Sequence, residues 1–476
     1  MTELHDLTAL GAAAAVRRKE VSPVELVEHA LDRIERLDDQ LGAFVTLTAE
    51  TARQQAKQAE ADVLAGDDPA ALPPFHGVPT AIKDLTLTKG VPTKLGSALY
   101  TDFVPDVDDH VVTLLKAAGL ISLGKTATPE FGLPCYTETD IGPPARTPWD
   151  TGRLSGGSSG GAGAAVGAGL IPIAQGSDGG GSIRIPASAC GLVGLKTARG
   201  RVSRGPIDLD PTRLSVFGPL ARTVRDAAAF LDVVAIPQPG DPDPLPRLPA
   251  GETFLGWCDR EPGRLRIGRF IDSPIPADVD PQVRAAWERT SELLAQLGHE
   301  IVNVTAPFPP EAITTFEMVW SVAAHSAPVD PAREAELRPL TRYLRARGAA
   351  VSGPQYAQAT GLLGLFARQA MAATEHLDAV LAPTLAQLPR PVGWFDHDGD
   401  PAADFERQKQ FTPYTAMYNM TGQPAISLPV HQSTEGLPIG MMLAGRRDGE
   451  APLLSLAAQV EGAAPWIDRH PPIWTA

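Results

Sequence analysis

The residues best suited to chemistry lie in a glycine- and serine-rich stretch between Ser155 and Pro186. It contains two clusters, residues 156–161 (GGSSGG) and residues 179–182 (GGGS), on either side of a largely apolar segment. Glycine weakens helices and strands, so such clusters are typical of close backbone approach or positive φ angles. A serine hydroxyl beside exposed backbone N–H groups provides a nucleophile and an oxyanion hole. The apolar residues between the clusters argue against a flexible linker.

A lysine far upstream is a candidate base. Lys83 lies near the end of an otherwise apolar segment, residues 78–85 (VPTAIKDL), which predicts a buried strand. Such a lysine commonly extends its charged end to water at the edge of a sheet. A buried amine instead has a lowered pKa and acts as a base near neutral pH. A neutral Lys83 would take a proton from one serine hydroxyl, which would take one from another, and Ser158 and Ser182 offer these hydroxyls.

Two other motifs indicate different chemistries. Residues 156–160 fit the GxSxG pattern of α/β-hydrolase esterases, with Ser158 as nucleophile and His431 or His470 as its histidine, although neither histidine has a distinctive setting. Residues 119–126 (GLISLGKT) match the phosphate-binding loop of P-loop NTPases. That motif needs a strand before it and a helix after it, whereas here a helix is predicted before it and a strand within it. The order favours a chance match.

The composition of the 476-residue chain narrows the class of protein. A net charge of −15 disfavours nucleic acid or an anionic membrane as partner. Three widely spaced cysteines form no disulfide framework and no metal-binding pattern, which is typical of the reducing cytoplasm. The N-terminus lacks the pattern of a signal peptide, and no apolar run approaches a membrane span. We therefore expect a cytoplasmic protein without nucleic-acid or membrane partners.

Strands alternating with helices predict an α/β fold around a mostly buried sheet. Residues 193–204 are predicted to be irregular. The predicted strands are residues 78–85, 120–123, 171–174, 265–270, 300–304, 377–383, 425–429 and 440–443, and the predicted helices include residues 49–64, 109–118, 160–169, 223–234, 281–297, much of 311–373, and 452–462.

The chain divides into three parts by composition. Residues 1–236 hold the N-terminal helices and the first part of the core, and a proline-rich, acidic segment follows them. Residues 237–376 are predicted to be mainly helical and to cap the substrate cleft. Residues 377–476 return to the core sheet and end in a closing helix. We expect these parts to form one catalytic domain.

The lysine segment and both serine clusters, in this order, resemble the amidase signature family. The motifs that carry the resemblance are FHGVPTAIKD, TPWD, GGSSGG, GSDGGGSIRIPA, GLVGLKTARGRVS and TGQPAISLP. The resemblance implies a Ser–cis-Ser–Lys triad, in which Ser182 is the nucleophile, Ser158 the bridging serine and Lys83 the base. The backbone N–H groups of Gly179, Gly180, Gly181 and Ser182 would form the oxyanion hole.

The resemblance also implies a large mixed sheet with helices on both faces, and no metal or organic cofactor. Asp178 and Arg184 would hold the nucleophile loop through charge-assisted hydrogen bonds, and Ser159 would support the same loop. Gly179 lies within the range of residues in the family and would either loosen the oxyanion loop or widen the pocket. The segment 143–147 (PPART) departs from the family pattern at a place that borders the substrate cleft in relatives.

The implied activity is amide hydrolysis through an acyl-enzyme. The pattern resembles bacterial amidases of the aryl-acylamidase, nylon-oligomer and urethane-cleaving types, so we expect a small or elongated, largely uncharged amide, with carbamates and esters as further candidates. We also expect a monomer or homodimer. The alternative within the family is the glutamine-amidase subunit of a tRNA-dependent amidotransferase. Cys135 lies in a loop on the cleft side, and the aromatic residues available for an apolar pocket are Phe316, Trp320, Tyr356, Phe366, Trp394, Tyr414 and Tyr418.

Overall fold

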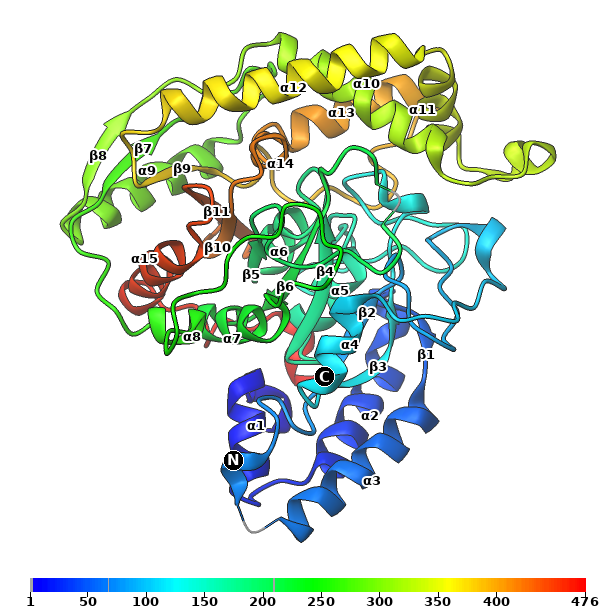
Figure 1. Cartoon of the computed structure of the whole chain (residues 1–476), viewed down its shortest axis with the longest axis vertical. Coiled ribbons are helices and arrows are strands. Elements are labelled where there is room, and N and C mark those ends of the chain that lie inside the picture. Colours follow the sequence, from blue (N-terminus) through cyan, green and yellow to red (C-terminus); the bar gives the residue numbers. More distant parts are fainter. Residues whose placement is uncertain (1–2, 67, 209) are drawn as a thin grey trace.

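A sheet of eight strands runs through the middle of the molecule in a computed structural model that describes residues 3–66, 68–208 and 210–476 (Figure 1). The strand order is β4-β6-β5-β10-β11-β9-β7-β8. The first six strands pair antiparallel, whereas β7 is parallel to both β9 and β8, so the sheet is mixed as predicted. The bounds are β4 Ile173–Asp178, β5 Val193–Lys196, β6 Val216–Ala221, β7 Arg266–Arg269, β8 Glu300–Asn303, β9 Ala379–Pro383, β10 Ala425–Gln432 and β11 Pro438–Gly445.

A second, three-stranded sheet has the order β1-β3-β2. Its strands are β1 (Phe44–Leu47), β2 (Pro79–Lys83) and β3 (Ile121–Thr126). It lies against the first strand of the large sheet, because the Thr80 hydroxyl donates to the Ile173 carbonyl of β4 at 2.9 Å. This contact brings the end of β2, with Lys83, beside the end of β4.

Helices cover both faces of the large sheet. One face packs on α7 (Val224–Val234), α9 (Pro281–Gln296) and α15 (Glu450–Ala463). The other packs on α5 (Gly160–Gly167), α6 (Arg184–Cys190) and α14 (Met417–Thr421). The remaining N-terminal and connecting helices are α1 (Ala9–Arg17), α2 (Pro23–Leu41), α3 (Ala49–Ala65), α4 (His110–Ala117) and α8 (Phe254–Trp257).

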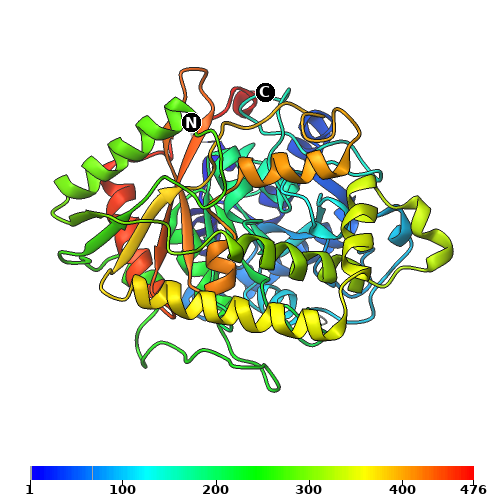
Figure 2. The same cartoon turned by 90° about the horizontal axis from the view of Figure 1, so that it is seen from above.

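Four further helices gather over one end of the molecule, at the top of Figure 1, and the view from above shows them crossing it (Figure 2). They are α10 (Glu311–Ser326), α11 (Pro339–Ala349), α12 (Gly353–Ala373) and α13 (Pro401–Phe411). The predicted division of the chain at residues 236 and 376 stays a prediction. Residues 237–376 contain α10 to α12 and also β7, α9 and β8 of the large sheet.

Local signals account for several of these elements. The Ser22 hydroxyl accepts from the Glu25 N–H and the Glu25 carboxylate accepts from the Ser22 N–H, which closes a capping box at the start of α2. Helix α5 consists of glycine, alanine and one valine and is buried along its whole length. Gly161 is required there, because an added Cβ would lie 2.3 Å from the Ala43 carbonyl oxygen and from the Ala127 nitrogen.

The fold corrects one sequence interpretation and agrees with another. Residues 193–196 are not irregular but form β5, which pairs with β6 and β10 inside the large sheet. The interpretation of residues 119–126 as a chance match to the P-loop pattern agrees with the structure, because residues 121–126 are strand β3 rather than a loop before a helix. Lys125 is buried there and donates to the hydroxyls of Thr88 and Thr93, so it is not directed at a phosphate.

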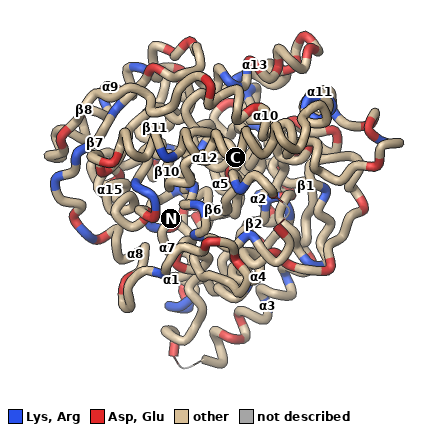
Figure 3. The backbone as a smooth tube through the Cα atoms, turned by 45° about the horizontal axis from the view of Figure 1, so that its top comes forward, with Lys and Arg blue, Asp and Glu red and all other residues tan. Residues whose placement is uncertain are grey.

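Charged residues are distributed along the whole backbone, with positions of Lys and Arg (blue) and of Asp and Glu (red) interspersed (Figure 3). Within the described residues, no helix combines the length and the apolar character needed to cross a bilayer.

Candidate active site

Lys83 is fully buried at the end of β2. Its Nζ lies 2.8 Å from the Ser158 hydroxyl oxygen, 3.0 Å from the Ser177 hydroxyl oxygen and 3.2 Å from the Ser177 carbonyl oxygen. Burial lowers the pKa of Lys83 from 10.5 to about 7, although the negative charge of Asp178 acts in the opposite direction. The amine therefore deprotonates near neutral pH while in contact with a serine hydroxyl.

Ser158 lies just before α5, and the peptide bond between Gly157 and Ser158 is cis. Its side chain is almost completely buried. The neighbouring Ser159 connects this segment to two others, because its hydroxyl donates to the Ser177 carbonyl at 3.2 Å and its N–H donates to the Ser182 carbonyl at 3.1 Å. Ser159 thus holds the Ser158 segment against the Ser182 loop.

Ser182 lies in the turn between β4 and α6 and faces a pocket. Lys83 and Ser158 are in direct contact, whereas among the described residues no hydrogen bond joins the hydroxyls of Ser158 and Ser182. The three predicted residues thus come from β2, from the start of α5 and from the β4–α6 turn, which the packing of the two sheets brings together.

An ion pair inside the protein holds the Ser182 loop. Arg184 donates from Nε and from one terminal nitrogen to the two oxygens of Asp178, at 2.9 and 2.8 Å, and both side chains are fully buried. Burial alone would raise the pKa of Asp178, but Arg184 and the hydrogen bonds lower it below its ordinary range. A buried pair of this geometry keeps both groups charged and orders the loop between them.

One of the four predicted oxyanion donors is already hydrogen-bonded within the loop. The Gly181 N–H donates to Asp178 Oδ1 at 2.8 Å and is therefore not available to a substrate, which corrects its assignment as an oxyanion donor. The N–H groups of Gly179, Gly180 and Ser182 have no acceptor in the described part of the chain. An added Cβ at Gly179 would lie 3.3 Å from the Trp320 ring, so glycine here permits the close approach of that ring.

Sequence analysis missed two residues that hold this loop, both in the segment 412–421. The Thr415 hydroxyl donates to the Gly180 carbonyl at 2.6 Å. The Asn419 side-chain amide donates to the Asp178 carbonyl at 2.8 Å, and its oxygen accepts from Arg184 at 2.7 Å. Their proximity to TGQPAISLP (residues 421–429) is the one signal in the sequence that could have drawn attention to them.

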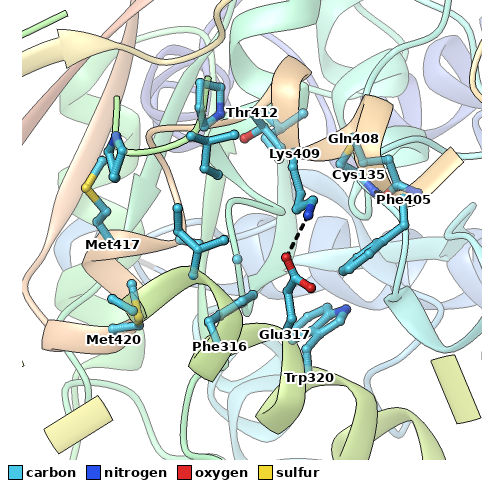
Figure 4. A pocket seen from close by; sticks show the side chains of 18 of the residues that line it. Cys135, Phe316, Glu317, Trp320, Phe405, Gln408, Lys409, Thr412, Met417 and Met420 are labelled. Carbon is cyan, nitrogen blue, oxygen red and sulfur yellow. Dashed lines mark hydrogen bonds and ion pairs between the residues drawn. The ribbon is translucent and has the colours of Figure 1, made fainter. Parts of the chain in front are cut away.

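Ser182 opens into a largely apolar pocket of about 860 Å³, counting the space open to solvent. Its walls come from the loop 133–135, the Ser182 loop, α10, α13 and α14, and Figure 4 shows the side chains that point into it. Glu317 from α10 and Lys409 from α13 meet across it at 2.7 Å. Such a lining suits an apolar ligand with few polar contacts.

The predicted lining residues divide between the pocket and the core. Cys135, Phe316 and Trp320 line the pocket, and the two aromatic rings stack with centroids 5.5 Å apart. Residues 143 and 144 do not line it, because the Pro144 carbonyl packs beside Gly42 at the end of α2. The other predicted aromatic residues pack in hydrophobic clusters outside the pocket lining, Tyr414 and Tyr418 as buried members and Tyr356, Phe366 and Trp394 as partly buried neighbours.

Neither of the two histidines proposed as partners of Ser158 in the esterase interpretation lies in the site. His431 Nε2 is hydrogen-bonded to the Thr290 hydroxyl at 2.9 Å, and the His470 ring stacks on Trp474. Neither histidine lines the pocket that contains Ser182.

Comparison with known proteins identifies the family of this chain. The Amidase family model matches residues 25–454. The 6-aminohexanoate-cyclic-dimer hydrolase of Paenarthrobacter ureafaciens is 34% identical over 97% of this chain and 96% of its own length. A glutamyl-tRNA(Gln) amidotransferase subunit of Roseiflexus sp. is 34% identical over 99% of each chain. A solved structure of a 6-aminohexanoate cyclic dimer hydrolase with substrate superposes with a TM-score of 0.90 and 32% identity, over 99% of this chain and 100% of that one.

The chain therefore belongs to the Amidase family. The similarity extends over almost its entire length, and the mixed sheet with its flanking helices is that of the solved relatives. The protein is an amide hydrolase.

Proposed function

We propose that this hydrolase cleaves its amide through an acyl-enzyme on Ser182, with Ser158 as proton relay and Lys83 as base. The observation that carries the proposal is the 2.8 Å contact between Lys83 Nζ and the Ser158 hydroxyl, made by a fully buried lysine whose pKa is lowered to about 7. A neutral Lys83 accepts the Ser158 proton while Ser158 accepts the proton of Ser182.

The Ser182 oxygen then attacks the amide carbonyl. The N–H groups of Gly179, Gly180 and Ser182 are the candidate donors to the resulting oxyanion, and loss of one such donor typically lowers the rate about 100- to 1,000-fold. The relay returns the proton to the leaving nitrogen, which departs as an amine. Water releases the carboxylic acid by the same route in reverse. Asp178 and Arg184 position the loop without taking part in proton transfer.

The pocket favours a small, uncharged amide with an aromatic or aliphatic body. Phe316 and Trp320 form one wall, and Met417 and Met420 of α14 form another. The relative from Paenarthrobacter is named for its action on the cyclic dimer of 6-aminohexanoate, an uncharged amide. Carbamates and esters are further candidates, because the same acyl-enzyme forms from either. We also propose that the enzyme acts in the cytoplasm as a monomer or homodimer.

A panel of neutral anilides, aliphatic amides, carbamates and esters tests the proposal, with Ser182→Ala as the blank. We expect hydrolysis by the wild type, and near-complete loss in both Ser182→Ala and Ser158→Ala. Hydroxylamine should divert the acyl-enzyme to a hydroxamate. Full activity in Ser182→Ala with loss in Ser158→Ala would instead support the esterase assignment of Ser158.

A further inference from the structure

The pocket beside Ser182 contains one charged pair in otherwise apolar surroundings. Among the described residues that line the pocket, Glu317 and Lys409 are the two with charged side chains. They extend toward each other from opposite walls, α10 and α13, and Figure 4 shows their contact in the middle of the pocket. Glu317 is only 8% exposed. A charge in such surroundings is stable only if it is paired.

Each member of the pair has a second partner. Glu317 accepts from Lys409 at 2.7 Å with one oxygen and from Arg347 of α11 at 3.1 Å with the other. Lys409 also contacts Glu406, on its own helix, at 2.5 Å. Two acids and two bases thus form a chain that is neutral as a whole. No charge in it is left for a ligand.

We propose that the Glu317–Lys409 pair makes the enzyme selective for amides whose bound portion is uncharged, and that each partner alone would select the opposite charge. The proposal rests on the function proposed above and specifies its substrate class. An ammonium or carboxylate on the substrate would enter the pocket without a free counter-charge and would lose its hydration. A neutral chain or ring loses little on entry and gains apolar contact with the walls.

Removal of one partner should change which charge on the substrate the pocket accepts. Lys409→Met leaves the Glu317 carboxylate with Arg347 alone, so that one oxygen becomes available to an ammonium group. Glu317→Gln leaves Lys409 with Glu406, so that the amine becomes available to a carboxylate. Both substitutions nearly preserve side-chain volume. The two variants should therefore shift charge preference in opposite directions.

The experiment uses three p-nitroanilides of nearly equal length: the neutral anilide of hexanoic acid, the cationic anilide of 6-aminohexanoic acid, and the mono-p-nitroanilide of adipic acid, whose second carboxyl group stays free and anionic. Their kcat/KM values are compared in the wild type, in Lys409→Met and in Glu317→Gln. We expect the wild type to prefer the neutral anilide. Relative to kcat/KM for the neutral anilide, kcat/KM for the cationic anilide should increase about tenfold in Lys409→Met. The same ratio for the anionic anilide should increase about tenfold in Glu317→Gln. This is the scale of one charge pair near a protein surface.

The matched control is Arg407→Gln, which removes a positive charge from the same helix. Arg407 pairs with Asp398 at 2.7 Å, and neither residue lines the pocket. The preference of the Arg407→Gln variant among the three anilides should equal that of the wild type. Thermal unfolding verifies that each variant folds, and Lys409→Gln replaces Lys409→Met if the latter does not.

The outcomes separate this proposal from the function on which it rests. If the wild type hydrolyses none of the anilides above the Ser182→Ala blank, the proposed function is wrong. If the wild type is active but prefers a charged anilide, the selectivity proposal is wrong. It is equally overturned if both variants shift in the same direction, or shift no more than Arg407→Gln does.

Discussion

We expect a single buried amine to determine how this site depends on pH. Among the described residues, the hydrogen-bond partners of Lys83 Nζ are oxygens of Ser158 and Ser177, and its burial lowers the pKa of Lys83 to about 7. The proposed base must be neutral to accept a proton, so we expect activity to rise as the pH passes through this value. This rise of activity with pH is the reverse of the pH dependence expected for a site that needs its lysine as a cation.

We therefore predict that kcat/KM for a neutral anilide rises with pH, about tenfold per pH unit below a pKa near 7, and becomes constant above it. The measurement is the initial rate between about pH 5 and 9 with the anilide well below its KM. The hydroxamate yield with hydroxylamine shows whether acylation still limits the rate. A profile without this rise would exclude Lys83 as the base.

The residues of the proposed triad could be predicted from the sequence, because each lies in a distinctive local motif. The residues that hold them could not. Thr415 and Asn419 are separated from the Ser182 loop by more than 200 residues and contact it only in the folded chain. The loss of Gly181 as an oxyanion donor also depends on a contact, the hydrogen bond to Asp178. Spacing along the chain contains no information on such contacts.

At the level of elements, the Ser182 loop is held from outside by the segment that leads into α14. Thr415→Val should lower kcat for a neutral anilide about tenfold with little change in KM, because the Thr415 hydroxyl orients the Gly180 peptide rather than the substrate. Steady-state kinetics measure the two constants. The control is Thr360→Val in α12, whose hydroxyl bonds to carbonyls of its own helix. An equal loss in both variants, or a change in KM alone, would contradict the positioning role.

Helix α5 can approach its neighbours closely only because its residues are small. Gly161→Ala should lower the free energy of unfolding by about 1–3 kcal/mol, since the new methyl group would overlap backbone atoms of Ala43 and Ala127. Gly361→Ala, at an exposed position of α12 with no atom within 4 Å of the added group, should raise it by about 0.5–1 kcal/mol. Denaturant unfolding compares the two. A stabilising effect of Gly161→Ala would show that α5 has room to move.

Helices with a strong cap or an amphipathic pattern were predicted nearly to the residue, as α7 illustrates. Strands β5 and β6 were missed for a physical reason. β5 has four residues and includes a glycine, and β6 contains Gly218 and Pro219, which usually interrupt a strand. Their position inside the large sheet stabilises them, and this is a property of the whole sheet rather than of either segment.

For the whole molecule, the choice is between an enzyme that acts alone and a subunit that needs a partner. The amidotransferase relative makes the second role worth testing. We predict that the purified chain hydrolyses a neutral anilide without any partner and faster than it deaminates glutamine, because the pocket is largely apolar. Added tRNA should leave the rate unchanged, since the chain carries a net charge of −15. Preferential glutaminase activity, or co-purification with a tRNA-binding protein, would favour the subunit role.

The hydrogen bonds from Thr415 and Asn419 to the Ser182 loop also bear on when the site can form during synthesis of the chain. A ribosome adds Lys83, Ser158 and Ser182 more than 200 residues before Thr415 and Asn419, and much of the pocket wall also comes from later segments. A nascent chain that ends between these points carries the residues of the proposed triad without the contacts that hold the Ser182 loop. We therefore expect hydrolytic activity only after the segment that contains Thr415 and Asn419 has been synthesised and has folded.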